Sequence, residues 1–156
     1  MEHSRFGNWG QSLLAGIAGA LALTTVHQLA RRVSAKAPRM DVVGERAIFA
    51  TSEALGRRPP SEPAAYRLAL AGDLLANTAY YSMIACGREA RLWTRAVTLG
   101  VGAGVGALLL PQRIGLGIPP RSWERSNQAM TVGWYLIGAL TTACTAECLR
   151  ARYNAG

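Results

Sequence analysis

Long apolar stretches alternate with short polar segments along this chain of 156 residues. A helix needs about 20 mostly apolar residues to cross a bilayer. Four stretches meet that requirement, and each is bounded by a charged residue or a helix breaker. They are residues 11–30, 64–86, 92–110 and 129–149. The pattern predicts an all-α, polytopic membrane protein with four transmembrane helices in a compact bundle.

A fifth helix is predicted in the first loop. Residues 40–56 alternate apolar and polar positions at helical spacing, with Met40 and Ala47 on one face. Gly56, followed by two prolines, is a stop signal. An amphipathic helix between spans lies in the membrane interface or packs against the bundle, and both remain open. With this helix included, residues 1–156 form a single integral membrane domain.

The charge of the chain bears on which partners the protein binds. Seventeen Lys and Arg residues stand against nine Asp and Glu residues, giving a formal net charge of +8, yet half of the residues are hydrophobic. Strong basicity can indicate nucleic-acid binding, but no basic stripe follows a helix here. We therefore expect no nucleic-acid partner. The expected partners are the lipid bilayer and its anionic lipids.

The positive residues also predict an orientation. Loops rich in Lys and Arg remain in the cytoplasm. Six positive residues belong to the two terminal segments and the second loop, whereas eleven lie in or beside the first and third loops, Lys36 among them. We expect a bacterial inner-membrane protein whose first and third loops are cytoplasmic and whose termini are both outside.

Small residues recur at helical spacing in the first and third spans. They allow helix backbones to approach closely, which drives helix association in lipid. The third span carries two GxxxG pairs on nearly opposite faces, so it is either central in the bundle or packs inward and against a partner. We expect a homo-oligomer or a subunit of a membrane complex. The predicted packing residues are Gly16, Gly19, Gly100, Gly102, Gly104 and Gly106.

Asp73 lies near the midpoint of the second span, within the sequence AGDLLANTAYYS. A charged residue at that depth is energetically unfavourable, so it faces the bundle interior or a partner, or it is protonated. Asn77 and Tyr81 follow it at helical spacing, and His27 and Gln28 form a polar strip near the cytoplasmic end of the first span. These five residues form a candidate polar pocket.

Two interpretations of Asp73 remain open. In the first and favoured one, an Asp–Asn hydrogen bond clamps helices together, as polar contacts between membrane helices often do. In the second, Asp73 belongs to a functional pocket for a proton or a lipid-like headgroup. His27 and Asp73 differ in depth by roughly 9 Å, so they would communicate through Asn77, Tyr66 or a water molecule.

The three cysteines lie toward the side predicted to be external. Buried, apolar thiols are the default interpretation of Cys86, Cys144 and Cys148. A disulfide between Cys86 and Cys148 is the alternative if that side is oxidising. No CxxC or HxxxH spacing occurs, so neither a metal nor another cofactor is expected.

No Ser-His-Asp or Cys-His arrangement can be identified, which argues against an enzyme. The favoured hypothesis is therefore an accessory, assembly or structural subunit that packs against itself or a larger membrane complex. The alternative is a small carrier or intramembrane enzyme that acts on a lipid, isoprenoid or proton through the pocket around Asp73.

Overall fold

The computed structural model describes residues 3–34, 37–86 and 89–155, and these residues are all-helical, without a strand. The elements are α1 (His3–Val33), α2 (Met40–Ala54), α3 (Glu62–Ala85), the short 3₁₀ helix η1 (Glu89–Arg91), α4 (Leu92–Arg113) and α5 (Arg125–Ala155). The all-helical prediction is therefore confirmed for the described residues. Lys36, used above to predict the orientation, lies outside them.

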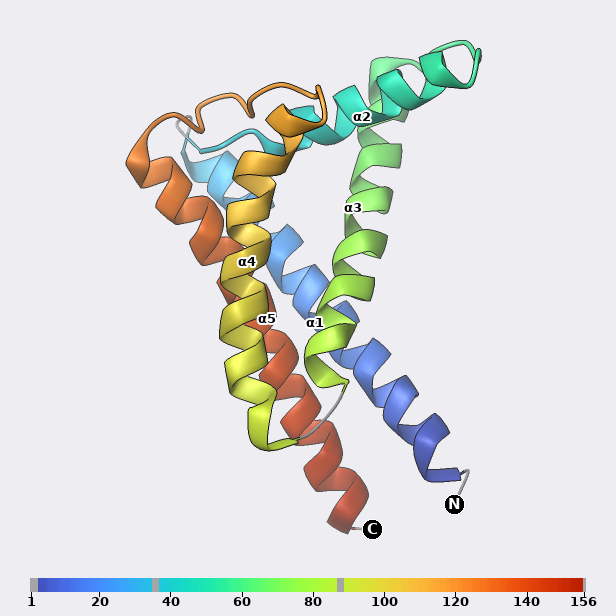
Figure 1. The fold of residues 1–156 in the computed structure, drawn as a ribbon, viewed down its shortest axis with the longest axis vertical. Coiled ribbons are helices and arrows are strands. Elements are labelled where there is room, and N and C mark those ends of the chain that lie inside the picture. The colour runs from blue at the N-terminus through green and yellow to red at the C-terminus, as the bar shows by residue number, and fades with distance from the viewer. Residues whose placement is uncertain (1–2, 35–36, 87–88, 156) are drawn as a thin grey trace.

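Four long helices run along the molecule, and α2 lies across one end of them (Figure 1). The two termini both lie at the opposite end. Helix α1 contacts both α3 and α5, α4 packs mainly on α5, and α2 packs on α3. This arrangement sets the two loops that flank α2, and the loop between α4 and α5, at the end away from the termini.

Three helical segments are long and apolar enough to cross a membrane: Trp9–Val33, Glu89–Arg113 and Arg125–Ala155. By this length and composition, the chain is a membrane protein. Helix α3 is not among the three, although it has 24 residues. Its polar residues Asp73 and Asn77 lower its mean hydropathy.

The helix ends depart from the sequence prediction at two places. Helix α4 continues through Pro111 to Arg113, although the prediction ended the third span before this proline. Proline lacks the N–H that would donate to the carbonyl four residues earlier, so α4 makes its last turn with one backbone hydrogen bond fewer. Helix α2 ends at Ala54, slightly before the predicted end. Gly56 then adopts a positive φ of 63°, a conformation that glycine reaches without a steric penalty.

Close helix contacts occur where α1 crosses its neighbours. A Cβ atom added at Gly16 would lie 2.6 Å from the carbonyl oxygen of Thr78 on α3. A Cβ at Gly19 would lie 2.6 Å from the carbonyl oxygen of Gly138 on α5. Both distances are too short for real atoms, so the two glycines permit these crossings.

The two glycine pairs of α4 differ in what they face. Cβ atoms at Gly100 and Gly104 would lie 2.7 Å from Cβ of Ala139 and 2.6 Å from Cα of Val132, both on α5. At Gly102 the nearest atom would be the Tyr80 hydroxyl oxygen, at 3.9 Å, and at Gly106 there is nothing within 4 Å. Within the monomer, only the first pair therefore requires glycine for packing.

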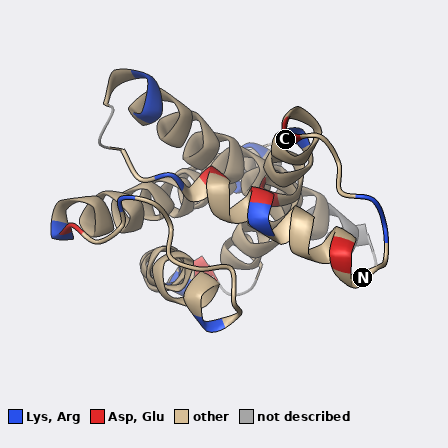
Figure 2. Ribbon diagram, turned by 90° about the horizontal axis from the view of Figure 1, so that it is seen from above, with Lys and Arg blue, Asp and Glu red and all other residues tan. Residues whose placement is uncertain are grey.

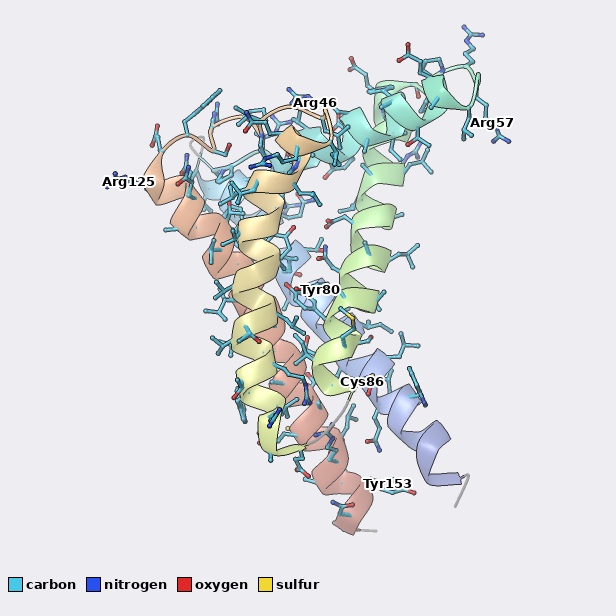
Figure 3. The ribbon with its side chains drawn as sticks, in the orientation of Figure 1. Arg46, Arg57, Tyr80, Cys86, Arg125 and Tyr153 are labelled. Atoms are coloured by element: carbon cyan, nitrogen blue, oxygen red, sulfur yellow. The ribbon has the colours of Figure 1, made fainter. Side chains whose placement is uncertain are left out.

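Charged residues gather on α2, in the loops and near the helix ends, and the long helices are mostly uncharged (Figure 2). Arg46 of α2 reaches the loop between α4 and α5, as the labelled side chain in Figure 3 shows. Its Nη1 donates to the carbonyl oxygens of Leu116, at 3.0 Å, and Ile118, at 3.2 Å. These bonds fasten α2 across the end of the molecule.

Candidate functional site

A cavity of about 240 Å³ lies beneath α2 and has walls from all five α-helices. We call it the α2 cavity. Leucine, valine, alanine and aromatic side chains make most of its surface. Its polar and ionisable side chains are those of Thr24, His27, Gln28, Asp41, Tyr66, Asp73, Trp134 and Tyr135. Three of the five predicted pocket residues, Asp73, His27 and Gln28, thus line one cavity.

Asp73 is exposed, although it lies at the middle of α3. Its neighbour Asn77 is buried, and Asn77 Nδ2 lies 2.9 Å from both Oδ1 and the backbone oxygen of Asp73. Donor and acceptor belong to the same helix, one turn apart. Among the described residues, no side chain of another helix forms an ion pair or hydrogen bond with Asp73. The Asp–Asn pair therefore does not connect two helices, contrary to the clamp interpretation.

His27 makes two contacts, one with a ring and one with a backbone carbonyl. Its ring lies 5.1 Å from that of Trp134, measured between centroids, with a tilt of 33°. Its Nε2 lies 3.4 Å from the carbonyl oxygen of Pro38. Because a carbonyl oxygen only accepts, this contact assigns the hydrogen to Nε2 and leaves Nδ1 as an acceptor. Any hydrogen bond between Nε2 of His27 and the Pro38 carbonyl requires the hydrogen to be on Nε2.

Gln28 and Tyr66 connect α1 and α3 at the cavity wall. Gln28 Nε2 donates to the Tyr66 hydroxyl oxygen over 2.9 Å. Sequence reasoning had mentioned Tyr66 only as a relay toward Asp73. In the structure Tyr66, Ala69, Leu70 and Asp73 share one face of α3, at the spacing of successive helical turns. That spacing is the signal from which Tyr66 could have been identified.

Asp41 is the second carboxylate of the α2 cavity, and two arginines compensate its charge. Arg31 Nη1 lies 3.1 Å from Asp41 Oδ2, and Arg39 binds the same carboxylate through Nε at 3.0 Å and Nη2 at 2.9 Å. These hydrogen bonds raise the pKa of Arg39 above its ordinary value. The first turn of α2 is thereby tied to the end of α1.

Two further features of the cavity wall concern hydrogen bonding. The hydroxyl oxygen of Thr24 is buried and has no hydrogen-bond partner among the described residues. Pro111 has no N–H, so it cannot donate to the carbonyl of Ala107 as the residue four positions later does in a regular helix. Both Ala107 and Pro111 line the cavity. The Thr24 hydroxyl is therefore a group that the described part of the fold leaves available to a ligand.

Tyr81 and Asn77, also predicted as pocket residues, do not line the α2 cavity. Tyr81 is completely buried between α1, α3 and α5. Its hydroxyl donates to the carbonyl oxygen of Tyr135 over 2.9 Å. A Cβ at Gly138 would lie 2.6 Å from that hydroxyl oxygen, so Tyr81 fills a space that only glycine leaves open. It is a packing residue at the helix crossing.

All three cysteines are free thiols, so the alternative of a Cys86–Cys148 disulfide is not realised. Cys86 lies at the end of α3 near the termini (Figure 3) and lines a hollow with Ala146 and Arg150 of α5. Residues four apart share a helix face, and the residue between them points away. Cys148 is accordingly exposed on the other side of α5.

Tyr135, Trp134 and Pro111 are cavity residues that sequence reasoning missed. Nothing in their local pattern distinguishes a cavity aromatic from one that faces lipid. Pro111 was interpreted as a helix terminator, whereas it remains inside α4 and removes a donor next to the cavity.

No family model matches this chain, and neither the curated proteins nor the solved structures include a significant match. The class that the fold defines is an all-helical membrane protein with a mostly apolar cavity, holding a few polar groups, under a transverse helix.

Proposed function

We propose that α3 is a fourth membrane span and that α2 lies in the membrane interface. A helix of 24 residues is about 36 Å long, enough to cross the hydrocarbon core. An even number of spans agrees with two termini at the same end (Figure 1). The buried position of Asn77 supports this proposal, because it removes one of the two polar groups of α3 from the lipid.

We further propose that the protein binds a small membrane-soluble molecule in the α2 cavity, as a carrier or receptor. The observation that carries the proposal is the cavity itself, about 240 Å³ with mostly apolar walls and a carboxylate without an interhelical partner. Ligand sites typically combine apolar walls with a few convergent polar groups. A carboxylate at membrane depth is costly, and Asp73 does not offset that cost by joining helices.

Binding is favoured over covalent catalysis. The described residues that line the cavity include neither serine nor cysteine, and the hydroxyl of Thr24 does not contact His27 through a hydrogen bond. Nucleophilic catalysis requires a nucleophile within hydrogen-bond reach of a base. The walls are instead suited to hold and release an intact molecule.

Native mass spectrometry of the mildly solubilised protein tests this proposal. Wild type should retain a small molecule that dissociates at higher collision energy. Ala107→Phe should abolish the added mass, because the new ring projects from the cavity wall on α4. Gly106→Ala is a matched control, since its methyl group has nothing within 4 Å. Equal retention by wild type and Ala107→Phe would contradict the α2 cavity as the binding site.

A second candidate function is that of an accessory subunit that packs on a partner helix. The observation in its favour is the open face at Gly102 and Gly106, which the monomer leaves free of close neighbours. Small residues on an open face allow a second helix to approach closely. Under this proposal Gly106→Leu removes a higher-mass assembly from the native spectrum and leaves the monomer folded. An unchanged assembly in that variant argues against the accessory role.

A further inference from the structure

We propose that the ligand of the α2 cavity is an amphipathic organic monocation, an amine with an apolar body, whose ammonium group binds at Asp73. This inference rests on the proposed binding function and adds the chemical class of the ligand. Its evidence is the charge and the hydrogen-bonding capacity of the cavity and the depth of Asp73.

The charge of the cavity opposes that of the whole chain. The protein carries a formal net charge of +8, yet the described residues that line the cavity include two carboxylates and neither Lys nor Arg. Asp41 is compensated by Arg31 and Arg39. Among the described residues, the side chain of Asp73 has a hydrogen bond only from the neutral amide of Asn77. One uncompensated negative charge therefore remains, which matches a ligand with a single positive charge.

The hydrogen-bonding groups of the cavity also favour a positively charged ligand, because they favour one that donates hydrogen bonds. An ammonium group has three N–H donors and no acceptor. The carboxylate of Asp73 is an acceptor, Nδ1 accepts in the neutral His27 ring, and the Thr24 hydroxyl oxygen can also accept. No cationic donor for a phosphate or carboxylate ligand lines the cavity within the described residues.

The aromatic residues add a further preference. Trp134 stacks on His27, and Tyr66 and Tyr135 complete an aromatic region of the same cavity. The faces of Trp and Tyr rings attract cations, most strongly where water is excluded. The apolar residues Leu23 and Leu70 provide surface for a hydrocarbon body.

The depth of Asp73 points to a ligand that dissolves in the bilayer. Leu70 and Asp73 of α3 and Ala107 and Pro111 of α4 all line the cavity. Asp73 is exposed at the midpoint of its helix. With α3 spanning the membrane, this carboxylate lies at the depth of the hydrocarbon core.

Calorimetric titration of the protein in lipid nanodiscs tests this proposal with three probes of one shape. They are 4-phenylbutylamine, 4-phenylbutanol and 4-phenylbutyrate, which share an apolar body and differ in the charge of the head group. Titration of empty nanodiscs is subtracted to remove partitioning into lipid. We expect the amine to bind wild type about tenfold more tightly than the alcohol, because a charge-assisted hydrogen bond replaces a neutral one. The carboxylate should bind most weakly.

Single-residue variants show whether Asp73 causes the preference for the amine over the alcohol. Asp73→Asn should reduce the affinity for the amine to that for the alcohol, and Asp73→Glu should preserve the preference. Glu62→Gln removes an exposed acid from the same helix, outside the cavity, and should change nothing. Circular dichroism confirms that each variant is folded.

The outcomes distinguish this proposal from the one on which it rests. Equal binding of amine and alcohol to wild type, with both lost in Ala107→Phe, overturns the cation proposal and leaves the binding function standing. Retention of the amine preference in folded Asp73→Asn also overturns it. If none of the three probes binds wild type above the empty nanodiscs, the cation proposal fails, while a small molecule retained in the native spectrum still supports the cavity.

Discussion

Asn77 donates to the carboxylate of Asp73 from one turn further along the same helix, with Nδ2 and Oδ1 2.9 Å apart. The same nitrogen lies 2.9 Å from the backbone oxygen of Asp73. Both bonds begin and end on α3, so they orient the Asp73 side chain without holding α3 to another helix. A membrane carboxylate that does not hold helices together is a candidate for a functional role.

The first prediction concerns the stability of Asp73 variants. Asp73→Asn and Asp73→Leu should both melt within about 2 °C of wild type in detergent, because a pair within one helix contributes only a few tenths of a kcal/mol. Thermal melts followed by circular dichroism provide the measurement. An interhelical clamp would instead make the Leu variant less stable by about 0.6 to 2 kcal/mol. A clear loss of stability in Asp73→Leu alone would therefore restore the clamp interpretation.

The two faces of α4 should respond differently to the same substitution. Gly100→Leu should destabilise the fold severely, since even its Cβ would lie 2.7 Å from that of Ala139. Overpacking of this kind costs typically about 1–3 kcal/mol, and more where backbones are in contact. Gly102→Leu is the matched control and should leave the monomer folded, because its Cβ meets only the Tyr80 hydroxyl, at 3.9 Å. Equal melting temperatures for the two variants would show that α4 does not pack on α5 through Gly100.

The attachment of α2 should depend on Asp41. Asp41→Asn leaves Arg31 and Arg39 without their carboxylate, so α2 should detach more often from the end of α1. Hydrogen exchange measured by mass spectrometry should accelerate in residues 40–54 and remain unchanged in α5. Glu53→Gln, at an exposed position of the same helix, serves as the control. Exchange that is the same in both variants would exclude Asp41 as the anchor.

The orientation in the membrane remains a prediction from the distribution of positive charge. Reporter fusions should detect Arg121 and Lys36 in the cytoplasm and both termini outside. In the structure the loops of this prediction lie at one end of the molecule and the termini at the other (Figure 1). Cytoplasmic activity from a fusion after residue 156 contradicts the orientation. Termini on opposite sides would instead contradict four spans.

Much of the helical architecture could be predicted locally. Apolar stretches longer than a bilayer is thick, the amphipathic pattern after Met40 and the stop at Gly56 all act within a few residues of one another. The predicted helices therefore coincide with the observed ones, with differences at their ends. Pro111 is one such difference, because a proline removes one hydrogen bond to the preceding turn and can kink a helix without ending it.

The candidate site was only partly predictable. Asp73, His27 and Gln28 could be named as unusual residues because polar groups are rare in apolar stretches. Tyr81 satisfied the same criterion, yet it lies at a helix crossing, buried against Gly138. Helical spacing defines which residues share a face but not which neighbour that face meets.

The sequence by itself determined that this protein is helical, that it contains apolar helices long enough for a membrane, and that a carboxylate lies within one of its helices. Only the tertiary structure decided that Gly100 faces α5 while Gly102 does not, and that α2 covers a cavity joining Asp73 to His27. The physical reason is the range of the interactions. Helix formation depends on residues three or four positions apart, whereas a cavity depends on how helices distant in sequence cross and which small residues let them approach.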